Sequence, residues 1–289
     1  PPINSSSSSR SPGPPVVPAE VPVAGQEEDQ LTEDGSAQYA HVLWQCCVKG
    51  KIDFLELFAG SARLSQACAL EGMAVGQPID IRSGFDLNSR EGQKRAMQLI
   101  IEQIPSVVHM APLCAPWSPW SNMKDEEKHW QDRVAVMPML RFCAQVAIHL
   151  IKLGRHLIIE NPRDSAIWYQ HSMQDLLKLA GVSYDDLNFC AFGMVDPLSN
   201  DYYKKPTSLM HNFRPGILDP IFKRCPNDVQ KRLVHKHEHV EGYAKGYGKR
   251  SKFSQVYPYK FCSSLAGLLA TELGVINSNK NELLIEDLL

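Results

Sequence analysis

The chain has 289 residues, a formal net charge of -2 and 44% hydrophobic residues, which suits one globular domain of ordinary size with a small addition. No apolar run approaches the roughly 18 residues of a membrane span, and the first residues lack the basic and apolar regions of a secretory signal. The eight cysteines follow no spacing pattern. We therefore expect reduced thiols in an intracellular protein rather than a disulfide framework or a membrane protein.

From Lys51 onward, short apolar runs alternate with longer amphipathic segments. We predict strands where a short apolar run ends at a turn residue, and helices where apolar residues recur at helical spacing. The predicted strands are 52–58, 74–79, 107–110, 156–159 and 188–194. The predicted helices are 62–70, 90–104, 134–153, 165–180 and 257–273. This alternation predicts an α/β fold with a doubly wound, mostly parallel sheet, in which ligands bind at the carboxyl ends of the strands.

The composition divides the chain into a folded domain and two tails. Residues 1–38 are rich in Pro and Ser and then in acids, and such a segment buries too little apolar surface to fold, so we expect it to be disordered. We expect the α/β domain at 39–212, with order beginning near Tyr39, and a small basic appendage at 213–256. A helix within 257–274 should pack back on the domain, and 275–289 should form a second tail.

The first candidate site is the loop 58–61, which follows a predicted buried strand. A glycine there lets the backbone approach a ligand, and the next helix offers its N-terminal amides, although one glycine also fits an ordinary strand–turn–helix corner. About twenty residues later, Asp80 is placed to bind ribose hydroxyls, and Asp86 an adenine amino group. Without G-x-G-x-x-G spacing, the pattern favours an adenosine–amino-acid cofactor over a dinucleotide. The expected cofactor contacts are Phe58, Ala59, Gly60, Ser61, Asp80, Ile81, Asp86, Leu87 and Pro112.

Two further loops carry residues that could do chemistry. Cys114 follows the predicted strand 107–110 in a loop stiffened by Pro112 and Pro116, where a thiol is placed as a nucleophile could be. Glu160 follows the strand 156–159 and should face the same edge of the sheet, where a polar group is costly to bury unless it is used. The alternatives are a structural cysteine and an acid that caps a helix or forms a salt bridge.

Together, in this order, the three segments resemble the motifs of the cytosine carbon-5 DNA methyltransferases. The sequence Phe58-Ala59-Gly60 resembles the family's Phe-x-Gly turn. Residues 111–118 resemble its Gly-Pro-Pro-Cys-Gln-x-Phe-Ser motif, and Glu160-Asn161-Pro162 resembles its Glu-Asn-Val motif. The resemblance covers about residues 52–194 and implies a Rossmann-like methyltransferase fold. The variants present here look closest to a divergent branch associated with retroelement polyproteins.

The resemblance implies a mechanism and a cofactor, S-adenosylmethionine. Cys114 would add to carbon 6 of a flipped cytosine, and Glu160 would hold a proton against ring nitrogen 3. Carbon 5 would then take the methyl group from S-adenosylmethionine, while Asn161 would orient the nucleophile loop. An adenine amino-group methyltransferase is disfavoured, because such enzymes need no nucleophilic cysteine.

The chain departs from the family at several positions. Leu113 replaces the proline before the cysteine, Pro162 replaces valine, and no Gln-x-Arg-x-Arg motif is recognisable. Lys205 stands where it could supply the missing positive charge. The departures favour, as the alternative, a catalytically weak or inactive module of a larger polyprotein that binds nucleic acid.

The C-terminal third is basic. From Lys204 to Lys260 the sequence has thirteen Lys or Arg residues against four Asp or Glu, interspersed with tyrosines, so we expect contact with DNA, and RNA stays open. The alternative is a solvated basic loop. We expect a monomer located in the nucleus, without a membrane partner. The expected substrate contacts are Trp117, Ser118, Lys204, Arg250 and Lys252.

A metal site was weighed in the same segment, at Cys225, His235, His237 and His239. The spacing is not that of a common zinc finger, and alternate residues of a strand point in opposite directions. His235 and His239 could share a helix face, with Cys225 brought in by the loop. Surface histidines are the simpler interpretation, and we predict no metal.

Overall fold

The computed structural model describes residues 50–119, 121, 125–240, 242–244 and 248–275. The predicted disordered tail 1–38, the predicted start of order near Tyr39 and residues 276–289 of the predicted second tail lie outside the described residues.

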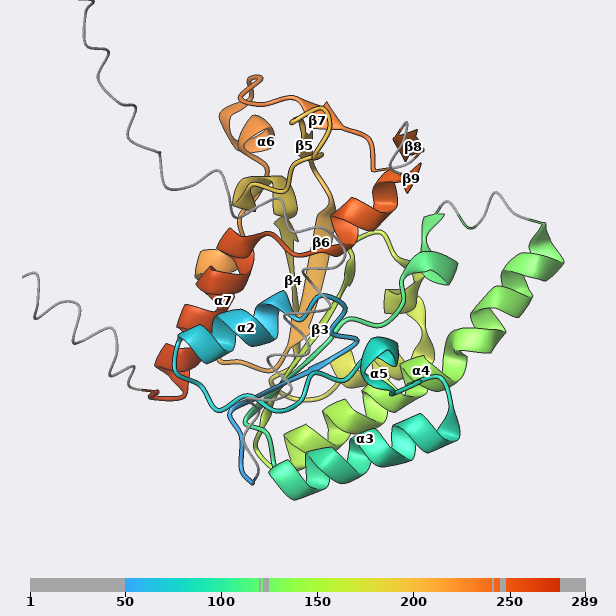
Figure 1. Cartoon of the computed structure of the whole chain (residues 1–289), viewed down its shortest axis with the longest axis vertical. Coiled ribbons are helices and arrows are strands. Elements are labelled where there is room, and N and C mark those ends of the chain that lie inside the picture. Colours follow the sequence, from blue (N-terminus) through green and yellow to red (C-terminus); the bar gives the residue numbers. More distant parts are fainter. Residues whose placement is uncertain (1–49, 120, 122–124, 241, 245–247, 276–289) are drawn as a thin grey trace, which may run out of the picture.

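The protein is a mixed α/β structure with a mostly parallel central sheet of five strands in the order β1-β2-β3-β6-β4 (Figure 1). The strands β1, β2 and β3 pair in parallel, and β6 lies antiparallel between β3 and β4. The carboxyl ends of β1–β4 therefore meet at one edge of the sheet, where β6 begins. We call this the carboxyl edge. The strands are β1 Phe54–Leu57, β2 Val107–Met110, β3 His156–Pro162, β4 Ser183–Asn188 and β6 Pro206–His211.

Helices cover both faces of the sheet because successive strand residues point to opposite faces. Leu55 and Leu57 pack into one apolar cluster with α3 (Arg90–Gln103), α4 (Glu126–Lys152) and α5 (His171–Leu177). Phe54 and Ile158 pack into a second cluster with α2 (Arg63–Leu70) and α7 (Tyr259–Glu272). The candidate catalytic residues Cys114 and Glu160 lie at the carboxyl edge, where the two apolar clusters end.

A smaller layer continues from the carboxyl edge. It contains β5 paired with β7, and β8 paired with β9. We call this part, residues 195–205 and 225–255, the basic layer. Its elements are β5 Tyr202–Tyr203, α6 Pro226–Gln230, β7 His237–Glu238, β8 Tyr243–Ala244, β9 Gly248–Lys249 and the 3₁₀ helix η7 Arg250–Gln255. The remaining 3₁₀ helices are η1 Ile81–Ser83, η2 Ala115–Trp117, η4 Ala166–Tyr169, η5 Phe189–Phe192 and η6 Asp219–Ile221.

By length and composition alone, α4 would qualify as a membrane-crossing helix, although 39% of its most apolar window is buried inside the protein. Its buried residues, among them Leu140, Phe142 and Val146, pack into the cluster beneath β1, β2 and β3. It begins at Glu126, eight residues before the predicted start, because the carboxylate of Asp125 accepts a hydrogen bond from the Lys128 amide and caps the helix.

Several predicted elements are wrong, each for a physical reason. The segment 188–194 is not a strand: its apolar residues form the buried turn η5, and the strand is the more polar segment β4, which lies at the sheet edge. The predicted helix 165–180 divides into η4 and α5. The segment 74–79 makes only two isolated bridges, through Val75 and Ile79 to β1. Strand β6 was not predicted, because its buried positions include Thr207, Ser208 and His211.

Candidate active site

The loop after β1 is a tightly coiled corner. Phe58, Gly60 and Ala62 all have left-handed backbone conformations, with φ of 58°, 53° and 55°. Two of these residues are not glycine, and each such conformation costs about 1–2 kcal/mol, so the corner is held by its surroundings. Apart from Gly60 and its two chain neighbours, no described residue has an atom within 4 Å of the place where a Cβ on Gly60 would stand. The described residues therefore leave space for a ligand over the loop.

Asp80 holds this corner in place. One carboxylate oxygen accepts a hydrogen bond from the Gly60 amide at 3.0 Å, and the other accepts one from the Arg82 amide at 3.0 Å. The structure thus brings together the two segments that the sequence singled out for a nucleoside. It also adds a role that the sequence did not predict, because Asp80 fixes the glycine turn directly.

The other expected cofactor contacts divide into accessible and buried side chains. Ile81, beside Asp80, is 72% exposed, which is unusual for a large apolar residue. Asp86 is exposed, and its carboxylate accepts a hydrogen bond from the Asn88 amide. Leu87 is only 3% exposed and packs in the core, so its side chain does not face a ligand. Ala59 and Pro112 are also buried, whereas Ser61 is partly exposed.

Cys114 stands at the start of η2, directly after the loop that leaves β2. Its side chain is partly buried, and burial raises the pKa of the thiol above its ordinary value. The positive charge of Lys205 lowers that pKa, whereas the negative charge of Glu160 raises it. The acid and the ammonium group therefore lie close enough to the thiol to affect its ionisation.

Glu160, near the end of β3, is only 6% exposed. Its Oε2 accepts a hydrogen bond from the Tyr257 hydroxyl at 3.1 Å. Its Oε1 is also buried and has no hydrogen-bond partner among the described residues. Burial raises the pKa of this carboxyl, while Lys205 and the Tyr257 hydrogen bond lower it. A buried carboxyl oxygen left unpaired is costly, and a substrate atom at this position would satisfy it.

Asn161 connects the end of β3 to the loop that follows β2. Its side-chain amide donates a hydrogen bond to the Pro112 carbonyl at 2.8 Å, within the core. Pairing of β2 with β3 places Met110 beside Ile159, so the residues that follow each strand meet. The loop that carries Cys114 is thereby fixed relative to Glu160.

Lys205 reaches the site because β6 runs antiparallel. Thr207 pairs with Pro162, so β6 begins where β3 ends. The Lys205 ammonium group donates a hydrogen bond to the Ser254 carbonyl at 2.6 Å and lies 5.1 Å from the centre of the Phe189 ring. Its φ of 31° is strained for a residue with a side chain.

Three polar residues of this region were not assigned to this site from the sequence: Glu56, His109 and Tyr257, the last of which was expected only among the tyrosines of the basic segment. Glu56 accepts hydrogen bonds from the Ser65 amide and hydroxyl, and burial raises its pKa to about 7. Burial lowers the pKa of His109 to about 3, and its ring meets that of Tyr257 edge-on at 5.7 Å. Glu56 and His109 could have been noticed in the sequence, because an acid within Phe-Leu-Glu-Leu and a histidine within Val-Val-His-Met are residue types not expected in a buried strand.

One of the expected substrate contacts is inaccessible in this structure, and a second is ion-paired. Trp117 is 2% exposed, and the Arg133 guanidinium lies 5.4 Å from its ring centre, so the indole is a core residue. Arg250 forms an ion pair with Glu238 at 2.5 Å and lies 3.7 Å from Asp196. Burial corrects the expectation for Trp117, whereas the Arg250 contact, like that of the ion-paired Lys204, stays a prediction.

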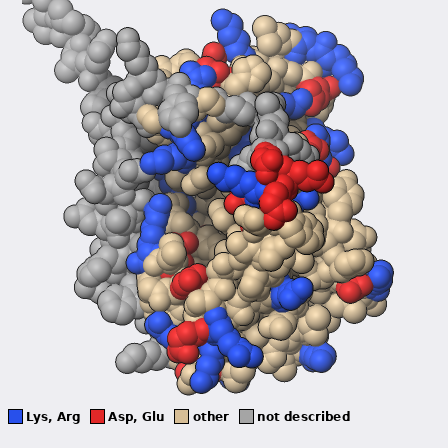
Figure 2. Space-filling view, turned by 90° about the vertical axis from the view of Figure 1, so that its right-hand side faces the viewer, with Lys and Arg blue, Asp and Glu red and all other residues tan. Residues whose placement is uncertain are grey.

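The other expected substrate contacts are more accessible. Lys204 is half-exposed and forms an ion pair with Asp228 at 2.9 Å. Ser118 is partly buried and Lys252 is exposed. Lys and Arg side chains are interspersed with acidic ones toward the top of the molecule, at the height of α6 and β7 (Figure 2). The exposed basic residues in and next to this layer are Lys223, Arg224, Lys231, Arg232, Lys236, Lys249 and Lys252.

Comparison with models of known protein families finds no match to this chain, and comparison with curated proteins finds no similar sequence. A function therefore has to be inferred from the residues at the carboxyl edge.

Proposed function

We propose that this protein methylates carbon 5 of cytosine in DNA, with S-adenosylmethionine as the methyl donor. The observation that carries the proposal is the arrangement around Glu160. One buried oxygen accepts a hydrogen bond from Tyr257, and the other has no partner among the described residues. The charge of Lys205 lowers the pKa of both Glu160 and Cys114, and the charge of Glu160 raises the pKa of Cys114. A thiol, a proton-holding acid and a cation at one edge are the groups that addition to a pyrimidine ring requires.

Each residue has a defined part in this chemistry. The Cys114 thiolate forms a bond to carbon 6, and Glu160 neutralises the charge that develops on the ring by holding a proton at nitrogen 3. When bound, S-adenosylmethionine would supply the methyl group to carbon 5 and leave as S-adenosylhomocysteine. A water molecule would then take the proton from carbon 5, the bond between carbon 6 and the Cys114 sulfur would break, and the double bond of the ring would be restored. The raised pKa of Glu160 favours the protonated form that this role needs, and Lys205 favours ionisation of Cys114.

The residues around Gly60 fit the cofactor. The open space over Gly60 can receive the amino-acid part, and Ile81 offers an exposed apolar surface to an adenine ring. Asp80 lies between them. S-adenosylmethionine supplies an electrophilic methyl group there, and the sheet would then be a Rossmann-like methyltransferase fold.

The exposed basic residues support a polyanionic substrate. Because Glu160 is buried, a cytosine could reach it only after leaving the base stack. Trp117 cannot stack on that base in this structure, so the basic layer would make contact mainly with phosphates.

The test is covalent trapping on a DNA duplex that contains 5-fluorocytosine, with S-adenosylmethionine present. Fluorine at carbon 5 cannot leave as a proton does, so the enzyme stays attached. We expect an adduct with the wild type and none with Cys114→Ser. Cys143→Ala, which changes a buried cysteine on α4, is the matched control and should still form the adduct.

The same experiment distinguishes the alternatives. An adduct with RNA but not with DNA would reassign the substrate. Cofactor binding without an adduct, across varied duplexes, would favour a non-catalytic nucleic-acid-binding module. The replacement of the family's proline by Leu113, which is 47% exposed beside the thiol, supports that interpretation.

A further inference from the structure

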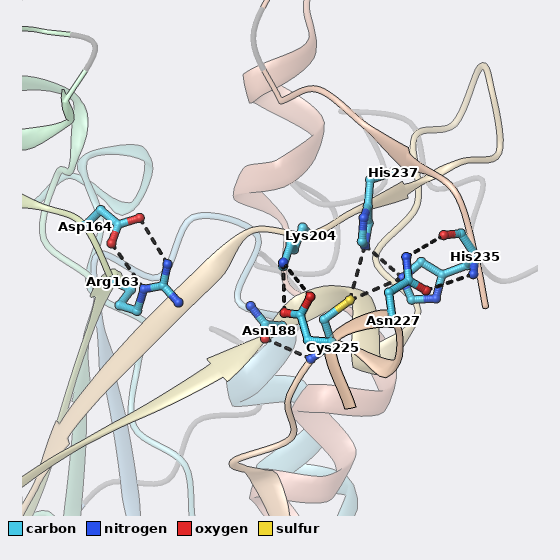
Figure 3. A network of polar contacts seen from close by, with 9 residues as sticks. Arg163, Asp164, Asn188, Lys204, Cys225, Asn227, His235 and His237 are labelled. Atoms are coloured by element: carbon cyan, nitrogen blue, oxygen red, sulfur yellow. Dashed lines mark hydrogen bonds and ion pairs between the residues drawn. The ribbon is translucent and has the colours of Figure 1, made fainter. Parts of the chain in front are cut away.

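A second group of reactive side chains lies away from Glu160, where the basic layer meets η5. Cys190, Cys225, His235 and His237 each direct one possible ligand atom inward, and all four atoms lie within 4.8 Å of one another. Figure 3 shows Cys225 with the two imidazole rings directed toward its sulfur. Both cysteines are buried, and the histidines are more accessible. None of the four residues has a part in the proposed methyl transfer.

The distances are close to those of a tetrahedral metal site. The Cys225 sulfur lies 3.5 Å from Nε2 of His237 and 3.9 Å from Nε2 of His235. In a tetrahedral zinc site with Zn–S of about 2.3 Å and Zn–N of about 2.05 Å, sulfur and nitrogen ligands stand about 3.6 Å apart. The two Nε2 atoms are 2.8 Å apart, shorter than the roughly 3.3 Å of such a site, so a small ring movement would complete the geometry.

Surrounding hydrogen bonds fix the two segments that carry Cys225 and His235. The Cys225 amide donates to the Asn188 side-chain oxygen at 2.9 Å, which links Cys225 to the end of β4, two residues before Cys190. Asn227 accepts from the His235 amide at 3.1 Å and donates to the His235 carbonyl at 2.8 Å. These contacts hold the ligand-bearing backbone independently of any contact between the side chains.

The strand pair β5–β7 positions His237. Tyr202 pairs with His237 in that sheet, and its ring stacks on His235 at 4.3 Å. His235 lies two residues before His237, and residues at that spacing along an extended chain point to the same side, so the two rings can meet. The sequence argument against the pair was wrong on this point, because it treated residues two positions apart as pointing in opposite directions.

We propose that Cys190, Cys225, His235 and His237 bind a structural zinc ion. Two thiolates and two imidazoles are a ligand set that zinc prefers, and four protein ligands leave no position for a substrate or water. Each thiol would release its proton to solvent on binding, and each imidazole would bind through Nε2. The ion would join η5, α6 and β7, and so attach the basic layer to the end of β4.

The first test is the metal content of the purified full chain. After dialysis against metal-free buffer, we expect elemental analysis to find one zinc ion per chain. Cobalt substitution should give the visible bands of a tetrahedral ion together with a thiolate charge-transfer band. A chain that holds no zinc, and takes up none when a stoichiometric amount is added, would overturn the proposal.

Variants then identify the ligands. Cys225→Ser and His237→Ala should lose most of the zinc, whereas His239→Ala, at a neighbouring histidine outside the cluster, should keep it. His237→Cys should retain zinc and intensify the thiolate band of the cobalt form. This rescue would separate ligation from a general folding defect, and unchanged zinc in Cys225→Ser would rule out the assigned site.

Discussion

The hydroxyl of Tyr257 donates a hydrogen bond to Oε2 of Glu160, although the two residues are 97 positions apart in the chain. Tyr257 lies just before α7, so packing of the C-terminal helix against α2 determines where this hydroxyl stands. Oε1 of Glu160 stays buried and without a hydrogen-bond partner among the described residues. A residue near the end of the described chain thus positions the acid of the candidate site.

Replacing Tyr257 with phenylalanine should slow trapping on 5-fluorocytosine DNA by about 10- to 100-fold, as expected for loss of a hydrogen bond to a charged or charge-developing group. The hydrogen bond lowers the pKa of Glu160, so its removal should raise that pKa further. Glu160 would then stay protonated to higher pH. The single-turnover rate, measured against pH, should therefore show an alkaline limb moved to higher pH.

Tyr259→Phe is the matched control, because Tyr259 is exposed and lies two residues away. It should leave both the rate and the pH profile unchanged. Equal slowing in both variants would mean that Tyr257 has no special relation to Glu160.

Replacing Lys205 with glutamine should reduce the reactivity of Cys114. The charge of Lys205 lowers the pKa of this thiol, so its loss should raise the pKa and decrease the thiolate fraction. Alkylation of Cys114 by iodoacetamide at neutral pH should slow by about tenfold. Mass spectrometry of the Cys114 peptide measures the rate without any assumption about substrate. Lys260→Gln, at an exposed position, should react as the wild type does.

Two aspartates allow a controlled test of whether the loop 58–61 binds the cofactor. Asp80 accepts the Gly60 amide at the carboxyl edge, and Asp53 accepts the Ala74 amide at the opposite end of β1. Asp80→Ala and Asp53→Ala each remove an acceptor for a backbone amide and should cost about 1–3 kcal/mol of stability. Calorimetry should show weaker binding of S-adenosylmethionine by Asp80→Ala alone. Equal affinities in the two variants would show that the loop does not bind the cofactor.

The buried carboxyl of Glu56 predicts a pH dependence of stability. Its pKa is raised from 4.5 to about 7, so between these values the folded state keeps a proton that the unfolded state releases. The contribution of this group to the free energy of unfolding therefore falls as pH rises through this range, by about 3 kcal/mol in total. Glu56→Gln should remove that decrease, whereas Glu91→Gln, at an exposed position, should not. Urea unfolding at several pH values measures it.

Most of the parallel core was predictable from the sequence, because its signals are local. Strand 107–110 is confirmed residue for residue, and the helices after Ala62 and Ser89 begin within one residue of their predicted starts. Strands β4 and β6 were missed, because β4 is a partly exposed edge strand and β6 buries polar residues that pair with its neighbours. Ser208, for example, donates a hydrogen bond to Asp186 across the two strands.

The candidate site was predictable where its residues directly follow parallel strands. Cys114, Glu160 and Asn161 fall at one edge for that reason, and Lys205 joins them through a strand that was not predicted. Tyr257 could not be placed, since its contact depends on the packing of a distant helix. The four candidate zinc ligands come from segments whose approach is determined by hydrogen bonds of Asn188 and Asn227, and no sequence spacing encodes those bonds.

The position of the segment between Cys225 and Tyr257 bears on how such a protein could diversify in evolution. The chain contacts the end of β4 through Cys225 and returns to β3 through Tyr257, both at the carboxyl edge. The described residues of the intervening segment add no strand to the central sheet. Insertions or exchanges between these two points could therefore change this segment while the hydrogen bonds of the sheet remain as they are. Under the proposed function, target choice and catalysis would then be free to evolve separately within one chain.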